Sequence, residues 1–180
     1  MRHKCLYSNI PDQNFNAENL SLNLMKISKI LIGIDDSTYA RNAAAYGFDM
    51  ARDYKAAVGL VHIIEPIVMP STPADNLTGI PVDSTFGIQD MELNEVQTSQ
   101  TETLIANTIK EFGDGLEVTA FKQYGSRAEG IIDCCKEFNA DMIVIGTHKR
   151  SGFDRLLIGS VAEHVVRHSA VPVLVVPFTE

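Results

Sequence analysis

Glycines, a serine and basic residues come close together in the last third of the chain, between an apolar run and a helical pattern. Gly146 directly follows the apolar run 142–145, and Gly159 and Ser160 open the helical pattern. Unpaired backbone N–H groups and a partial positive charge make a helix N-terminus favourable for anions. Three basic residues lie between the glycines: Lys149, Arg150 and Arg155. This layout predicts a site that holds a phosphate-bearing ligand largely through backbone groups.

The loop does not match the better-known phosphate-binding motifs. It lacks the G-x-x-x-x-G-K-[ST] pattern of a P-loop. No G-x-G-x-x-G follows the first apolar run, where Gly33-Ile34-Asp35-Asp36 stands instead, and this weighs against a dinucleotide dehydrogenase. His148 is the only candidate acid or base in the loop, and no nucleophile–base pair is evident, so we predict no catalytic residue.

The elements that must position this loop alternate along the chain. Apolar runs predict five strands, over 29–34, 57–64, 116–123, 142–145 and 171–176, with a helical pattern between each pair. This alternation predicts an α/β fold, a three-layer, Rossmann-like sandwich with a five-stranded parallel sheet and helices on both faces. Ligands of such sheets bind beyond the carboxyl ends of the strands. Asp35 and Gly146 follow two of these ends, so we expect them to face one crevice.

Polar residues mark the expected helix starts. Ser37 is a good N-cap for the first helix. Two further pairs have the spacing of a capping box: Ser126 with Glu129, and Ser160 with Glu163. His164 and His168 are spaced as in zinc-binding helices, but no third ligand is evident nearby, so no metal site is predicted. They are expected to lie near a helix C-terminus, where positive charge is favourable.

Length and composition predict one globular domain behind a flexible N-terminal extension over 1–24, which lacks periodicity. Four of the seven prolines fall within 65–90, which is typical of a long loop. The net charge of −8 argues against general binding to nucleic acid, and no apolar run approaches the ~20 residues of a membrane span. Cys134 and Cys135 are adjacent and form a poor disulfide or metal pair; we expect one in the core and one nearer the surface. The cysteine usage favours a cytoplasmic location.

Three segments together carry a family pattern: KILIGIDDS from Lys29, VHII from Val61, and GTHKRSG through LLIGSVAEHV to VPVLVV, starting at Gly146. With these segments the chain resembles the universal stress protein (UspA) family, and the resemblance assigns 25–180 to that domain. ATP-binding members carry Gly, two residues, Gly, nine residues, then Gly followed by Ser or Thr. Gly146, Gly159 and Ser160 match this motif, whereas Lys149 stands in place of its middle glycine.

The resemblance implies an ATP site. Asp35 would contact the ribose or the base, the backbone of Ile63 would contact the adenine edge, and the Ser160 hydroxyl would donate to phosphate. Any Mg²⁺ would be bound mainly through the phosphates. The implied nucleotide-binding residues are Ile34, Asp35, Ile63, Gly146, His148, Lys149, Gly159, Ser160 and Val161.

The residues leave alternatives open. Asp35 also fits a plain turn residue before Ser37, and Lys149 either adds a charge or fills the phosphate path. The first hypothesis is a cytoplasmic, dimeric stress-response protein that binds ATP as a switch, is at most a slow ATPase, and acts on an unknown protein partner. The second is a dimer that binds partners without nucleotide, and the third an enzyme for another phosphorylated small molecule. The homodimer is expected to form through strand 171–176, because Pro172 and Pro177 fit an edge strand.

Overall fold

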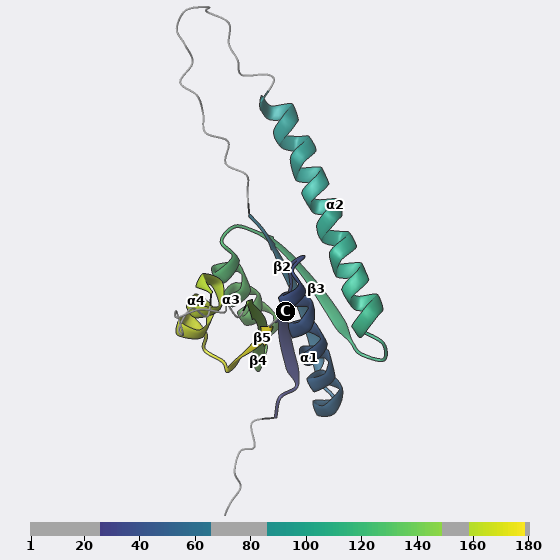
Figure 1. The fold of residues 1–180 in the computed structure, drawn as a ribbon, viewed down its shortest axis with the longest axis vertical. Helices are drawn as coiled ribbons and strands as arrows, with labels where there is room; N and C mark the ends of the chain where they lie inside the picture. Colours follow the sequence, from purple (N-terminus) through teal and green to yellow (C-terminus); the bar gives the residue numbers. More distant parts are fainter. Residues whose placement is uncertain (1–25, 66–85, 149–158, 179–180) are drawn as a thin grey trace, which may run out of the picture.

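The computed structural model describes residues 26–65, 86–148 and 159–178. Three predicted features lie outside these ranges: the N-terminal extension, most of the proline-rich loop, and the basic residues Lys149, Arg150 and Arg155. Strands and helices alternate throughout (Figure 1): β1 (Lys29–Gly33), α1 (Thr38–Tyr54), β2 (Ala57–Ile64), α2 (Phe86–Phe112), β3 (Val118–Tyr124), α3 (Arg127–Phe138), β4 (Met142–His148), α4 (Ser160–His168) and β5 (Val173–Phe178).

The five strands form one parallel sheet in the order β3-β2-β1-β4-β5. This confirms the predicted α/β sandwich and places the first strand in the centre. The third and fifth strands lie at the two edges, and the edge position of the fifth is the one that Pro172 and Pro177 predict. Because the chain reverses its winding direction after β3, β1 and β4 become neighbours, and the switch point of the sheet lies between their carboxyl ends.

Each face of the sheet is covered by two helices. On one face, Phe48 of α1 and Ile105 of α2 pack on Ile32 and Leu60. The opposite face carries Ile143 and its neighbours, and α3 and α4 cover it. Side chains on a strand alternate between faces, so continuous apolar runs such as β1 supply both cores at once. The buried residues of α1 are mostly small, and they let this helix lie close to the sheet.

The N-cap prediction for Ser37 is confirmed, because its Oγ accepts a hydrogen bond from the N–H of Ala40 at 3.1 Å. Both predicted capping boxes are wrong. Ser126 is the N-cap of α3 but makes no side-chain capping bond. Its expected partner Glu129 instead accepts a hydrogen bond from His164 Nε2 at 2.6 Å, which ties α3 to α4.

In α4 the N-cap is Gly159, and Ser160 is the first helical residue. The backbone of Gly159 has φ 86° and ψ 140°, a conformation that favours glycine. The carboxylate of Glu163 accepts from Arg167 one turn later, rather than turning back to the start of the helix. Ser160 and Glu163 thus have the spacing of a capping box, but Glu163 pairs with Arg167 instead.

Other boundaries also differ from the predictions. The helix α2 begins at Phe86, inside the expected loop 65–90, while β3 begins at Val118 and β5 at Val173, two residues later than expected. The strand β4 continues from 145 to His148. Cys134 and Cys135 are both buried, because α3 packs against both the sheet and α4. Burial raises the pKa of the Cys134 thiol to about 11, which keeps it protonated at neutral pH.

Candidate functional site

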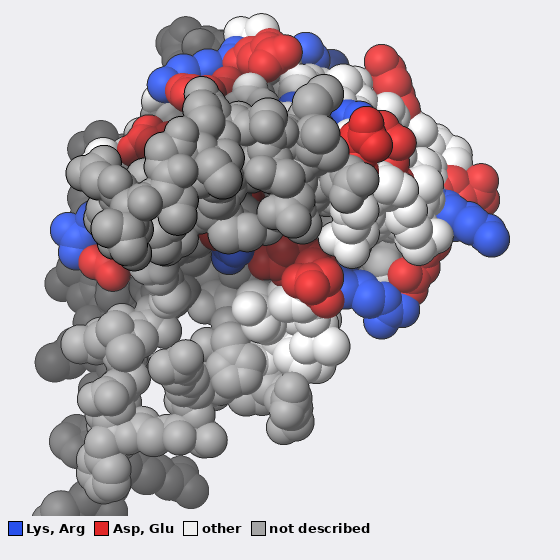
Figure 2. Space-filling model, turned by 90° about the horizontal axis from the view of Figure 1, so that it is seen from above, with Lys and Arg blue, Asp and Glu red and all other residues white. Residues whose placement is uncertain are grey.

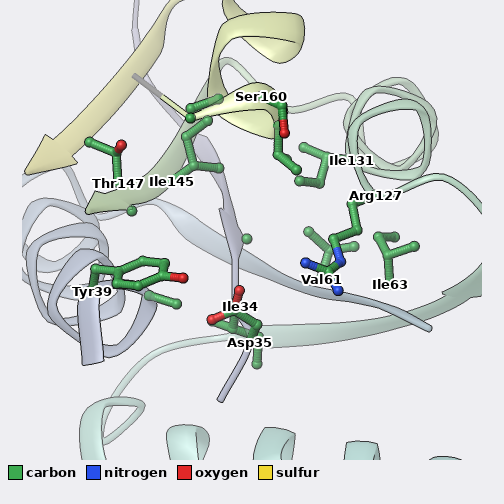
Figure 3. A pocket seen from close by; sticks show the side chains of 16 residues that line it. Ile34, Asp35, Tyr39, Val61, Ile63, Arg127, Ile131, Ile145, Thr147 and Ser160 are labelled. Carbon is green, nitrogen blue, oxygen red and sulfur yellow. The ribbon is translucent and has the colours of Figure 1, made fainter. Parts of the chain in front are cut away.

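A cavity of about 460 Å³ opens at the carboxyl edge of the sheet, above β2, β1 and β4 (Figure 3). It spans the switch point at which β1 and β4 meet. Its volume falls within the range of small-molecule sites. The described residues that line it are Gly33, Ile34, Asp35, Tyr39, Ala40, Val61, Ile63, Arg127, Ile131, Ile145, Gly146, Thr147, Gly159, Ser160, Val161 and Ala162.

Three helices begin at this cavity. Tyr39 lies in the first turn of α1, Arg127 is the first residue of α3, and Ser160 is the first residue of α4. Since helices that follow parallel strands start at the carboxyl edge, their N-terminal N–H groups gather at one side of the fold. Each such terminus carries a partial positive charge. The arrangement favours a ligand with negative charge, as the sequence predicts.

Most of the predicted site residues line this one cavity: Ile34, Asp35, Ile63, Gly146, Gly159, Ser160 and Val161. His148 is the last residue of β4, but its side chain and the whole of Lys149 lie outside the described residues. The sequence therefore identifies the edge of the sheet, and the predicted residues that line the cavity come from the ends of β1, β2 and β4 and from the start of α4. The contacts of these residues with a ligand stay predictions.

Asp35 serves as a turn residue and also lines the cavity. Its Oδ1 accepts hydrogen bonds from the N–H of Ser37 at 2.9 Å and from the Ser37 hydroxyl at 2.5 Å. Among the described residues, no hydrogen bond to Oδ2 accompanies these two. The preceding residue is fixed by β2, because Ile34 N–H donates to Val61 at 2.9 Å and its carbonyl accepts from His62 Nδ1 at 3.0 Å. The carboxylate is thus held in place where it lines the cavity.

The cavity differs in character from one end to the other. Figure 3 shows Val61, Ile63 and Ile131 on one side, Ser160 at the start of α4 and Asp35 between the walls. The β2 end is therefore mainly apolar, whereas the β4 end lies beside the N-terminus of α4. A ligand with an apolar or aromatic part and a charged part fits this division.

Two polar residues that line the cavity, Tyr39 and Arg127, are not among the site residues predicted from the sequence. Arg127 Nη2 lies 2.7 Å from Glu65 Oε2, and the two side chains are about half exposed. Its position gives a usable signal, because a residue directly after an N-cap that follows a parallel strand must lie at the carboxyl edge. Tyr39 is the second residue of α1 and lies at the same edge.

Elsewhere in the described chain, His164 and His168 stack with ring centroids 4.1 Å apart, and His168 Nδ1 donates to the His164 carbonyl at 2.8 Å. No group of three potential metal ligands occurs within the described ranges. No helix in those ranges is both long and apolar enough to cross a bilayer. On the described part of the face in Figure 2, acidic and basic side chains are interspersed.

Comparison with known proteins adds an independent line of evidence. The model of the universal stress protein family matches residues 26–177. Universal stress protein MJ0531 of Methanocaldococcus jannaschii is 28% identical to this chain over 161 residues, which cover 89% of the chain and 85% of that relative.

Solved structures agree with this match. The structure of protein MJ0577, also from M. jannaschii, is similar with a TM-score of 0.63 and 25% identity, over 86% of this chain and 99% of that one. The universal stress protein of Archaeoglobus fulgidus in complex with dAMP has a TM-score of 0.54 and 19% identity, over 84% and 98% of the two chains. At that identity the likeness shows a shared fold.

Proposed function

The chain belongs to the universal stress protein family, and from this premise we propose that it binds an adenine nucleotide, ATP above all, in the cavity at the carboxyl edge of its sheet. In this proposal the protein is a cytoplasmic, dimeric stress-response protein. Nucleotide occupancy changes the surface that it presents to a protein partner.

The observation that carries the proposal is the meeting of three features in one cavity. An apolar end beside Val61 and Ile63 suits a base, a fixed carboxylate at Asp35 suits a ribose hydroxyl, and the N-terminus of α4 suits phosphate. A nucleotide presents these three chemical groups in the same order. The cavity volume of about 460 Å³ is also of the size that such a ligand needs.

The phosphate end depends on Gly159. With a side chain at this position, the β-carbon would approach Thr147 Oγ1 only to 3.7 Å, so space does not explain the glycine. Its positive φ does, because this backbone turn leads directly into the first N–H groups of α4. Those groups and the Ser160 hydroxyl are the proposed phosphate donors, and Gly146 lines the same cavity. Mg²⁺ would be bound mainly by the phosphates.

Two further observations support an adenine nucleotide over other phosphate compounds. The A. fulgidus relative of the same fold carries dAMP. The apolar wall at β2 offers little to a sugar phosphate that lacks a base. Turnover is expected to be slow at most, since the described lining residues include no nucleophile–base pair.

The experiment is extraction of the freshly purified protein with acid, followed by mass detection of adenine compounds, and then titration of the emptied protein with ATP, AMP and adenosine. We expect co-purified nucleotide or a Kd in the micromolar range or below. A protein that releases none and binds none of the three contradicts the proposal. In that case the Lys149→Gly variant should also be titrated with ATP. A gain of ATP binding in this variant supports the alternative hypothesis, in which Lys149 fills the phosphate path and the dimer binds partners without nucleotide.

A further inference from the structure

Arg127 and Glu65 form an ion pair at the β2 end of the cavity. Glu65 directly follows β2, and Arg127 opens α3, so two elements far apart in the sequence bring these charges to 2.7 Å. With about half of each side chain exposed, the pair itself adds little to stability. Arg127 nevertheless lines the cavity, and Figure 3 shows its guanidinium beside Val61 and Ile63. A planar cation thus lies next to the apolar wall.

The topology separates this cation from the phosphate end. The strand β1 lies between β2 and β4, and neighbouring strands are about 4.8 Å apart, so the ends of β2 and β4 are separated by roughly 10 Å. Gly146 belongs to β4, and the α4 N-terminus lies above it, whereas the partner of Arg127 belongs to β2. A nucleotide with its phosphates at Ser160 therefore directs its base, and not its phosphates, toward Arg127.

We propose that Arg127 is a specificity-determining residue that stacks its guanidinium on the nucleobase, on the same side of the cavity as Val61 and Ile63. The inference rests on the proposed function and adds a residue to it. Guanidinium groups stack on aromatic rings through their flat, weakly hydrated surface, which an ammonium group lacks. Glu65 acts as a positioning residue, because its carboxylate holds the guanidinium at the wall before the ligand arrives.

The test is a ligand series in which the base stays constant and the charge grows. Adenosine, AMP and ATP are titrated by calorimetry into the wild-type protein and into Arg127→Ala, Arg127→Lys and Glu65→Gln. Ribose 5-phosphate serves as the ligand without a base. Lys136→Ala is the control on the same helix, since its exposed ion pair with Asp133 lies outside the cavity lining. Urea unfolding of each variant checks that the fold is intact.

If Arg127 contacts the base, Arg127→Ala lowers the affinity for adenosine, AMP and ATP by the same factor, about tenfold. The affinity for ribose 5-phosphate stays unchanged. Arg127→Lys loses nearly as much, because the charge remains but the flat surface is gone. Glu65→Gln gives a smaller loss with unchanged stability. A loss that grows from adenosine to ATP, or full recovery by lysine, means a phosphate contact and overturns this inference alone. Failure of the wild-type protein to bind any of the three nucleosides and nucleotides overturns both this inference and the proposed function.

Discussion

Gly146 of β4 faces the backbone of Tyr39 so closely that a β-carbon at Gly146 would lie 2.4 Å from the Tyr39 carbonyl oxygen. Real β-carbons do not approach backbone oxygen at that distance. The N-terminal turn of α1 therefore rests directly on the end of β4. Because the Asp35–Ser37 turn leads into this same helix, the spacing between β4 and α1 also sets one wall of the cavity.

Gly146→Ala should therefore lower both stability and ligand binding. The methyl group meets backbone, which cannot rotate away, so we expect a loss of about 2–3 kcal/mol in the free energy of unfolding, the upper part of the usual range for overpacking. Gly33→Ala is the matched comparison, since its β-carbon would lie 3.0 Å from the Ile145 side chain, which can adjust. Urea titration of both variants checks the order. A Gly146→Ala protein as stable as Gly33→Ala would contradict the close approach of α1 to β4.

Gly159→Ala tests the backbone at the start of α4. A residue other than glycine is strained at φ 86° and ψ 140°, by roughly 1–3 kcal/mol. Gly115→Ala is the control, because Gly115 also has a positive φ, 74°, and open space around it, but lies between α2 and β3. We expect both variants to lose stability, and Gly159→Ala alone to lose nucleotide affinity. Equal affinity in the two variants would argue against a phosphate at this turn.

Ser160→Ala separates ligand binding from helix capping. Because Gly159 is the N-cap and the Ser160 side chain makes no capping bond within the described part of the chain, the free energy of unfolding should stay within about 0.5 kcal/mol of the wild type. The affinity for AMP should fall about tenfold, the value of a hydrogen bond to a charged group, while adenosine affinity is unchanged. Ser37→Ala is the opposite case: its Oγ caps α1, so about 1 kcal/mol of stability is lost. Calorimetry and urea unfolding read out the two effects separately.

The fold can be predicted from local patterns in the sequence. Short apolar runs of β-branched residues predict the strands, and their alternation with helices implies parallel pairing. The shared cavity of Asp35 and Gly146 follows in turn, because carboxyl ends of parallel strands meet at one edge. The proposed role of Arg127 does not follow, since it depends on the neighbouring position of β2 and on the direction of one long side chain.

The helix starts show a second limit of prediction from the sequence. The sequence S-x-x-E occurs at Ser126 and at Ser160, and neither pair forms the reciprocal capping bonds. Each glutamate has a competing partner, His164 for Glu129 and an arginine one turn away for the other. A motif shows that a contact is available, but competing contacts from other elements decide whether it forms.

Asp141 connects the starts of β1 and β4, and its pH dependence can be measured. Partial burial alone would raise its pKa, but hydrogen bonds from Ser28 N–H at 2.7 Å, from Ser28 Oγ at 2.8 Å and from Lys29 N–H at 2.9 Å outweigh burial, and the pKa is lowered. A lowered folded-state pKa gives stability that is present above the unfolded value of about 3.9 and is lost as the pH falls through the folded value.

Asp141→Asn should therefore cost about 1–2 kcal/mol at pH 7 and flatten the loss of stability below about pH 4. The control is Asp133→Asn, which removes an exposed carboxylate paired with Lys136 on the surface of α3. Urea unfolding of both variants and the wild type between pH 7 and pH 3 is the measurement. A wild-type profile that Asp141→Asn reproduces unchanged would show that this carboxylate does not link the two strands energetically.

The backbone orientation of the edge strand β5 determines how it could pair with a second copy in the proposed homodimer. The Pro172 carbonyl accepts from Ile143 N–H at 3.0 Å, so position 172 faces β4. Backbone groups alternate along a strand, and Leu174 therefore also faces β4, whereas Val173 and Val175 direct their N–H groups away from the sheet. Pro177 faces outward too and has no N–H to donate, which limits a second strand to the outward donors of Val173 and Val175.

Val175→Pro should for this reason shift the dimer toward monomer and leave the fold intact, because it removes an outward donor that β4 does not use. Leu174→Pro removes a donor on the β4 side and should instead lower the free energy of unfolding. Sedimentation equilibrium over a range of protein concentrations measures the first effect, and urea unfolding measures the second. A wild-type protein that stays monomeric at high concentration contradicts dimerisation. A Val175→Pro protein that remains fully dimeric argues for an interface on another surface, since a ladder through β5 would then keep only the outward donor of Val173.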